Sequence, residues 1–349
     1  MIHILFSLLL GSMISLLLVA PSSYYLILSL IPIIGFVLII ILKKSIPRPS
    51  KYIVISMPFV IILSYLLTSF IVFHPNNIEL KINSSTLKSE NKAVILYADG
   101  EMEKYIPYFA VENLKSKPLL IKPIESFKIK QGYNTIGYSE KNKEILKISN
   151  EFRSSLLNNT PNYYYLAYSS FTPSLNEAIM TSVKDKCRDI TIINLSIKPE
   201  SSEYISSIKS SLVQSGLSVK ITTPVFDSIK METLLDNKKI DSTNYSSVLV
   251  LTEKTDQGVK DILYKKGFKD NNIFIDPNLN TGLKSIHNAS LKGKILIINL
   301  IDFNGSLYDK YTINKISKKY DDLNIDTISP YSYRKDMLEY IINEYQNAK

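Results

Sequence analysis

The residues that most often carry chemistry are scarce in this sequence. There are three histidines (His3, His74 and His287) and a single cysteine, Cys187. No histidine has a metal-ligand type at helical spacing, and one cysteine excludes an internal disulfide and a cysteine-rich metal site. The sequence also lacks a P-loop, a dinucleotide fingerprint and the nucleophile elbow of serine hydrolases. Taken alone, these residues assign no reaction.

Any site must be positioned by the segment 162–199, which reads as strand, loop, helix and strand. Tyr163–Tyr168 and Ile190–Ile197 are apolar runs suited to buried strands. The helix between them has one apolar stripe, made by Leu175, Ile179, Val183 and Cys187. This crossover predicts two parallel, neighbouring strands. Because parallel sheets place ligands at the carboxyl ends of their strands, we expect a site near the loops 169–174 and 198–202.

Two residues compete for the start of that helix. If Thr172 is the cap, Pro173 takes the first helical position. If Ser174 is the cap, Glu177 completes a capping box three residues later. The stripe also predicts that Cys187 is a buried structural thiol.

The rest of the chain from about residue 92 repeats the alternation of strand and helix. Further strands are expected at 93–98, 118–121, 219–222, 247–251, 273–275 and 294–301, and helices at 139–157, 205–216, 256–266 and 333–345. The pattern predicts an α/β fold with two parallel-sheet, Rossmann-like subdomains, at 92–225 and 247–349. The polar stretch 226–246 lies between them.

The first 75 residues are of a different kind, with no acidic residue and four basic ones. Three apolar stretches, Ile2–Pro21, Tyr24–Leu42 and Tyr52–Phe73, each have about the 20 residues that cross a bilayer. We expect a membrane region at 1–75 with three transmembrane helices, followed by a polar linker at 76–91. The cations cluster in one loop, 43–51, and positive loops stay cytoplasmic. The α/β part is therefore predicted to be extracytoplasmic, on a multi-pass cell-membrane protein, unless one stretch fails to span.

The formal net charge of +9 is spread along the chain. Four of these charges belong to the cation loop, and no basic cluster with interleaved aromatic residues stands out. This distribution is typical of a lysine-rich solvated surface, and we expect no nucleic-acid partner.

The segment Tyr133–Phe152 resembles the ferrochelatase family, whose first domain has a Y-x-x-I-G-G element opening a helix. Tyr133, Ile136, Gly137 and Ile145 match in register. Ala98 and Gly100 are similar to the family's first strand and turn, and 171–178 is similar to its proline-containing loop and helix. The order of segments fits over most of 92–349. The resemblance implies a chelatase-like fold that binds a tetrapyrrole, with a porphyrin or a divalent metal ion as substrate and no required cofactor.

The resemblance also marks candidate positions at the rim of a ligand cleft: Asp99, Tyr138, Thr172 and Glu177. Thr172 stands where the family has its metal-handling histidine, Asp99 replaces a tyrosine, and Tyr138 replaces a glycine. Asp302 and Asp309 lie near the family's second-half acid but out of register. Threonine is neither a nitrogen ligand nor a base, so catalytic residues are unassigned and no metal ligand is predicted.

Three readings remain from different classes. The first is a membrane-anchored, ferrochelatase-like lyase or tetrapyrrole-binding protein. The second is a non-catalytic extracytoplasmic binding or scaffold module on the same fold. The third is an unrelated α/β domain, since parallel sheets host many functions.

Overall fold

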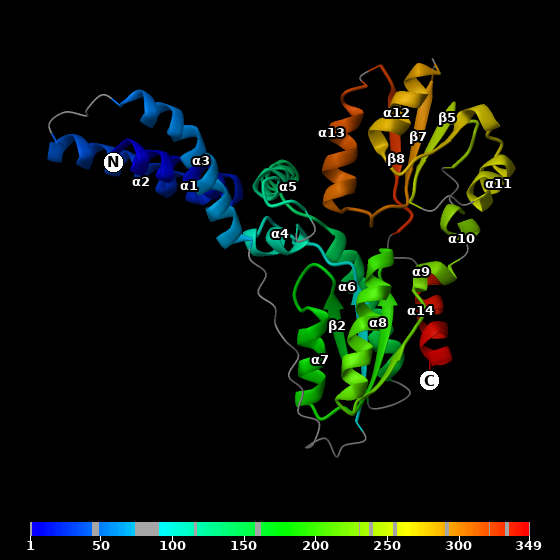
Figure 1. Cartoon of the computed structure of the whole chain (residues 1–349). Coiled ribbons are helices and arrows are strands. Elements are labelled where there is room, and N and C mark those ends of the chain that lie inside the picture. The colour runs from blue at the N-terminus through cyan, green and yellow to red at the C-terminus, as the bar shows by residue number, and fades with distance from the viewer. Residues whose placement is uncertain are drawn as a thin grey trace. The chain divides into compact units, whose positions relative to one another are not determined.

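The computed structural model (Figure 1) describes residues 2–43, 49–73, 91–114, 117–157, 162–229, 231–236, 240–253, 257–289, 293–320, 322–331 and 335–348. The predicted linker, most of the cation loop and His74 lie outside these ranges. The chain forms two compact units, residues 1–78 with 104–137, and residues 79–103 with 138–349. Residues 104–137, expected in the first α/β subdomain, thus belong to the unit of the N-terminal apolar helices.

The first unit is helical. Its elements are α1 (Ile2–Val19), a short 3-10 turn (Ser22–Tyr24), α2 (Tyr25–Lys43), α3 (Lys51–Val72), α4 (Pro107–Asn113) and α5 (Lys122–Ile136). Among the described residues one helix, α3, is long and apolar enough to cross a membrane, with a mean hydropathy of 2.2. The other apolar helical stretches, His3–Val19 and Ser22–Gly35, are shorter than the 18 residues needed for such a span.

Helices α1 and α3 pack in parallel through small residues. A Cβ on Gly11 would lie 2.0 Å from Ser64 Oγ, so only glycine permits this approach. Four residues on, the hydroxyls of Ser15 and Ser69 are 3.0 Å apart. Since the paired positions ascend together along both helices, the two helices run in the same direction. Small residues and interhelical hydroxyl contacts are typical of packing between membrane helices.

The second unit contains two four-stranded parallel sheets, which confirms the α/β prediction. The first has the order β2-β1-β3-β4, and its strands are β1 (Lys92–Ala98), β2 (Asn162–Tyr168), β3 (Asp189–Leu195) and β4 (Ser218–Ile221). Strands β2 and β3 are parallel as predicted, but the prediction that they are neighbours was wrong. Strand β1, buried at every position after Lys92, lies between them.

The second sheet repeats the plan of the first, with the order β6-β5-β7-β8. Its strands are β5 (Ser247–Leu251), β6 (Ile273–Ile275), β7 (Lys294–Asn299) and β8 (Asn324–Ile328). The sequence Ile-Asn-Leu recurs at the end of the third strand in chain order, where it closes β3 in the first sheet and spans the last two residues of β7 and Leu300 in the second. Each asparagine, Asn194 and Asn299, accepts from a backbone N–H two residues on. The two halves are therefore structural repeats.

Helices cover and connect the strands of this unit (Figure 1). They are α6 (Lys141–Leu157), α7 (Leu175–Lys184), α8 (Pro199–Gln214), α9 (Val225–Ser228), α10 (Met231–Leu235), α11 (Gln257–Lys265), α12 (Leu279–Asn288), the π-helix η4 (Tyr308–Ile313), α13 (Asn314–Ser317) and α14 (Lys335–Ala348), with a 3-10 turn at Asp270–Asn272. Ser174 is the cap of α7, and its side chain and that of Glu177 form the capping box. Cys187 is fully buried among the apolar residues on one face of the first sheet.

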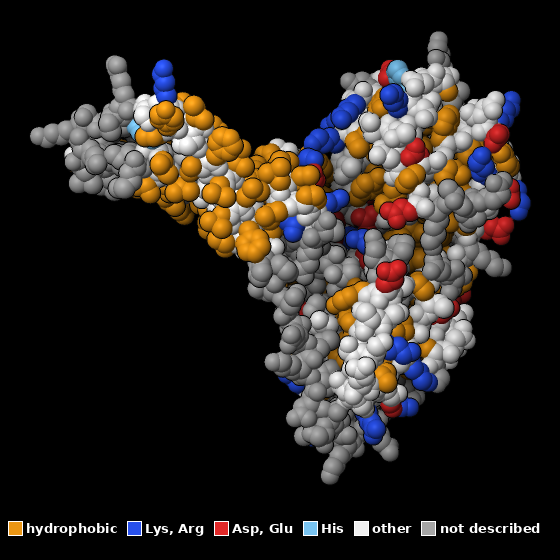
Figure 2. All heavy atoms as spheres, in the orientation of Figure 1, with side chains coloured by type: hydrophobic (Ala, Val, Ile, Leu, Met, Phe, Trp, Pro, Cys, Tyr) orange, Lys and Arg blue, Asp and Glu red, His pale blue; other side chains and the backbone are white. Residues whose placement is uncertain are grey.

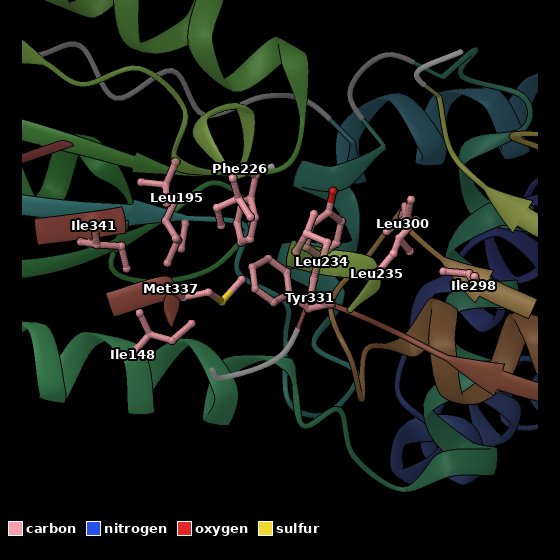
Figure 3. Packing of buried hydrophobic residues seen from close by; sticks show 14 of the residues in the cluster. Ile148, Leu195, Phe226, Leu234, Leu235, Ile298, Leu300, Tyr331, Met337 and Ile341 are labelled. Carbon is pink, nitrogen blue, oxygen red and sulfur yellow. The ribbon is translucent and has the colours of Figure 1, made fainter. Parts of the chain in front are cut away.

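Some sequence predictions differ from the structure. Residues 118–121 form the turn before α5 instead of a strand. His287 lies in the last turn of α12. The final helix, α14, was placed in the second subdomain but packs against the first half, with the rings of Tyr345 and Phe152 6.0 Å apart. It belongs to a buried cluster shared by the two halves, in which Met337 and Ile341 lie near Leu195 (Figure 3).

Candidate functional site

Asp99 links the carboxyl ends of three strands of the first sheet through hydrogen bonds. It follows β1 directly and is buried. Its carboxylate accepts from Ser196 Oγ (2.5 Å) and the Ile197 backbone N (2.7 Å) after β3, and from Ser169 Oγ (3.3 Å) after β2. With its oxygens engaged by internal donors, this carboxylate stabilises the strand ends. The next residue must be glycine, because a Cβ on Gly100 would lie 2.5 Å from the Tyr168 side chain.

Thr172 and Glu177 lie together at the start of α7. Thr172 Oγ1 donates to Glu177 Oε2 across 3.4 Å, and the same oxygen accepts from the Ser174 backbone N at 2.6 Å. The capping box therefore holds Glu177 in place, and the Thr172 hydroxyl is turned toward it. The carboxylate at the N-terminus of α7 also suits the helix dipole.

Tyr138 faces solvent, with 44% of its surface exposed, and Thr172 and Glu177 are exposed as well. Two ammonium groups lie over its ring, Lys143 Nζ at 4.7 Å and Lys310 Nζ at 5.1 Å from the centroid. Lys310 comes from the π-helix η4 of the second half and also pairs with Glu140 at 2.6 Å. π-Helices are frequent at functional sites. The structure thus brings together Thr172 with Glu177, while Asp99 and Tyr138 have partners of their own.

A buried ionic cluster beside Tyr138 joins the two halves of the unit. Lys141, at the start of α6, places its Nζ 2.5 Å from Asp302 Oδ1, with only 4% of its side chain exposed. Glu101, two residues after Asp99, accepts from Ser139 Oγ and from the Leu307 backbone N. The backbone N of Glu140 donates to the Gly305 carbonyl at 2.9 Å. The loop after β1 is therefore fixed to the loop after β7.

The charges in this cluster support one another. Burial raises the pKa of Glu101, and Lys141 opposes that rise. Burial would lower the pKa of Lys141, but the carboxylates of Asp302, Asp99 and Glu101 outweigh it and raise that pKa. At the surface, the hydrogen bond from Lys310 lowers the pKa of Glu140. Lys141 is therefore a charged ammonium at neutral pH, and its role is to neutralise buried carboxylates.

The arrangement offers binding groups more readily than proton-transfer groups. The groups at this surface are the exposed Tyr138 ring, the exposed Lys143 and the half-buried Lys310, which is paired with Glu140. A ring and two ammonium groups suit a flat, anionic ligand. Within the described part of the chain, no group of three His, Cys, Asp or Glu side chains is placed to share a metal ion. His287 lies in the second half of the α/β unit, with its Nε2 3.3 Å from Asp322 Oδ2.

Sequence reasoning did not select Lys141, Glu101 or Ser139. The sequence did indicate Asp302 as a possible site residue, because it follows a strongly apolar strand, although its register did not match the family. Nothing in the sequence indicated that Lys141 is buried, since a lysine in the first turn of an amphipathic helix is usually solvated. Its burial depends on contacts with the second half of the chain.

The chain is similar to two solved structures of the sirohydrochlorin chelatase SirB from Bacillus subtilis. One is from the subspecies spizizenii in complex with cobalt, at 10% identity, and the other carries Fe³⁺, at 11% identity. Each similarity covers 74% of this chain and 95% of the other, with a TM-score of 0.43. The sequence matches no family model and no curated protein. No residue role is transferred at this level of identity.

Proposed function

We propose that this protein is a membrane-anchored, chelatase-like protein whose α/β unit binds a tetrapyrrole beside Tyr138. The observation that carries the proposal is the exposed Tyr138 ring with the two ammonium groups of Lys143 and Lys310 over it. The order of the segments that resemble the ferrochelatase family supports the same ligand class, as does a unit of two parallel sheets with this surface beside the carboxyl end of β1.

A tetrapyrrole is a flat π-system with carboxylates at its edge, and both features match this surface. The phenol ring provides a face for stacking. In the free protein the lysines rest on that ring, a contact worth about 0.5–1 kcal/mol at an exposed site. A charge-assisted hydrogen bond to a carboxylate is worth about 1.5–3 kcal/mol, so the ligand draws Lys143 from the ring to its edge. For Lys310 the ligand carboxylate also competes with Glu140, which already accepts from that ammonium group.

Metal insertion demands more than this surface supplies. The reaction removes two pyrrole protons, and general-base help is typically worth 10²–10⁴-fold in rate. The family's histidine position is Thr172, which donates to Glu177, and the carboxylate of Asp99 is engaged by three internal donors. We therefore propose tetrapyrrole binding, with insertion absent or slow.

The test is an absorbance titration of the full chain in detergent with protoporphyrin. We expect a saturable shift of the Soret band for wild type and a weaker one for Tyr138→Ala and Lys310→Ala. Tyr163→Ala is the matched control, because Tyr163 is similarly exposed (42%) but lies at the start of β2, at the other end of the sheet. Equal binding by all variants would remove the site, and no saturable shift would remove the proposal.

A second candidate function is a non-catalytic extracytoplasmic binding or scaffold module. It is favoured by the internal pairing of Asp99, Glu101, Lys141 and Asp302, because these charges hold the two halves together and are not turned to a ligand. A chain that gives no Soret shift yet remains folded and membrane-bound would fit this candidate.

We further propose that the α/β unit is extracytoplasmic and that all three N-terminal helices span the membrane. The parallel packing of α1 and α3 supports this, because two spans that cross in the same direction need α2 to return between them. Fusing alkaline phosphatase or a fluorescent protein after Lys349 tests the topology. Strong fluorescence with a silent phosphatase would contradict it.

A further inference from the structure

A short apolar segment, Pro118–Ile124, is exposed in the first unit. Leu120 has 53% of its surface exposed, Ile121 40% and Ile124 45%. These side chains lie close together in sequence, in the turn before α5 and in its first residues. Contiguous exposed apolar side chains on a protein surface mark a place of contact with a partner or a lipid.

The position of this segment along α3 identifies what covers it. The Tyr65 hydroxyl donates to the Leu120 carbonyl across 2.9 Å. Tyr65 lies seven residues before Val72, where α3 ends, which is about 10 Å along the helix axis. Leu120 is therefore beside the body of the apolar helix, where Leu67 and Ile71 are also exposed (59% and 68%). Figure 2 shows hydrophobic side chains gathered over these N-terminal helices.

The segment is held there by contacts that satisfy the end of α1. Lys130, buried on α5, donates to the carbonyls of Leu17 (2.8 Å) and Ala20 (2.9 Å). The Tyr105 hydroxyl donates to the Val19 carbonyl. The last carbonyls of a helix have no partner within it, so Lys130 holds α5, and Tyr105 holds the residues before α4, at the C-terminal end of α1.

Charge supports a lipid as the covering partner. Residues 104–137 contain six lysines and two glutamates. Lys117 and Lys128 are exposed on either side of the apolar segment, and the half-buried Lys122 lies within it. Lys128 also pairs with Glu125 at 2.7 Å. Basic residues next to a membrane surface are attracted to anionic headgroups. Apolar side chains flanked by lysines are the pattern of a segment that lies in the interface.

We propose that Pro118–Ile124 inserts its apolar side chains into the lipid leaflet alongside the C-terminal half of α3, with the flanking lysines at the headgroups. The chain would then contact the bilayer through a segment that follows β1, in addition to its N-terminal helices. The proposal needs α3 to cross the membrane and does not depend on the tetrapyrrole.

The test uses the full chain in liposomes of phosphatidylcholine and phosphatidylglycerol. Leu120→Cys and Ile124→Cys are each labelled with an environment-sensitive fluorophore. Cys187 contributes little background, since it is fully buried and burial raises the pKa of its thiol to about 11. Tyr163→Cys, in the α/β unit, is the control for a site in water.

We expect nitroxides on the lipid acyl chains to quench the labels at 120 and 124, and aqueous iodide to quench only the label at 163. Iodide quenching at 120 and 124 equal to that of the control would overturn the proposal. Labels shielded from both quenchers would also overturn it, because protein rather than lipid would then cover the segment. Two independent positions keep the test decisive if one variant misfolds.

Discussion

Removing the Lys141 ammonium should destabilise the α/β unit far more than removing any surface lysine. Lys141→Met keeps most of the apolar stem and deletes the charge 2.5 Å from Asp302. The variant leaves the half-buried Asp302 carboxylate and the Glu101 carboxyl without their cation. Breaking a buried pair by removing one partner costs about 3–5 kcal/mol. Because Asp302 is 18% exposed, we expect the lower end, about 3 kcal/mol.

The assay is urea unfolding of the full chain in detergent, followed by circular dichroism of the helical signal. With a slope of about 3 kcal/mol per molar urea, the midpoint should fall by about 1 M. Lys143→Met is the matched control, since Lys143 is exposed on the same helix. Surface substitutions of that kind stay within about 0.5 kcal/mol.

A second variant separates charge from packing. Lys141→Met combined with Asp302→Asn removes one of the stranded carboxylates and should recover about 1 kcal/mol or more. The reasoning is refuted if Lys141→Met unfolds at the same urea concentration as Lys143→Met. It is also refuted if the double variant is less stable than Lys141→Met alone, because the loss would then come from packing.

Four further outcomes are expected. Cys187→Ser should lower the free energy of unfolding by roughly 1–2 kcal/mol, since it buries a hydroxyl, and fast labelling of Cys187 in the folded chain would contradict its burial. Burial raises the pKa of Glu101 in the folded protein, so wild type should lose stability relative to Glu101→Gln as the pH rises above about 4.5. Thermal melts of both proteins from pH 4 to 8 measure this, and the opposite trend would contradict the burial of Glu101. Gly11→Leu should separate α1 from α3, measured as a lower yield of the Ser15→Cys to Ser69→Cys disulfide. Zinc insertion into protoporphyrin should be absent or about 100-fold slower than in an intact ferrochelatase, and Thr172→His should raise it; full-rate turnover by wild type would show that another residue is the base.

Much of the α/β architecture could be predicted from the sequence because its strands are continuous apolar runs. Lys92–Ala98 and Lys294–Asn299 are buried on both faces. They therefore lack the alternation of apolar and polar residues that is typical of a strand with one face in water. The order within the first sheet could not be read from the chain, since sequence neighbours need not be neighbours in the sheet. The central place of β1 depends on its burial between β2 and β3.

The misassigned segments share a physical cause. Residues 118–121 are apolar and read as a strand, yet they lie beside α3, so their environment differs from that of the α/β core. Helix α5 was missed because its one buried lysine, Lys130, faces the end of α1 and breaks the apolar pattern. Contacts with another element, rather than local propensity, decide both cases.

The contacts of the candidate site residues could not be predicted from the sequence. Asp99 and Tyr138 were both selected by their positions in the family resemblance. What each residue does depends on partners distant in sequence, such as Ser196 for Asp99 and Lys310 for Tyr138. Those partners cannot be paired from one sequence.

The most direct test of the central proposal is hydrogen exchange of the full chain with and without protoporphyrin. Bound tetrapyrrole should protect the backbone at 138–143, which carries Tyr138 and Lys143, and at 305–310, which ends in Lys310. The first strand and α7 should exchange as in the free protein. Protection confined to other segments, or no protection at saturating ligand, would contradict the assignment of this surface as a tetrapyrrole-binding site.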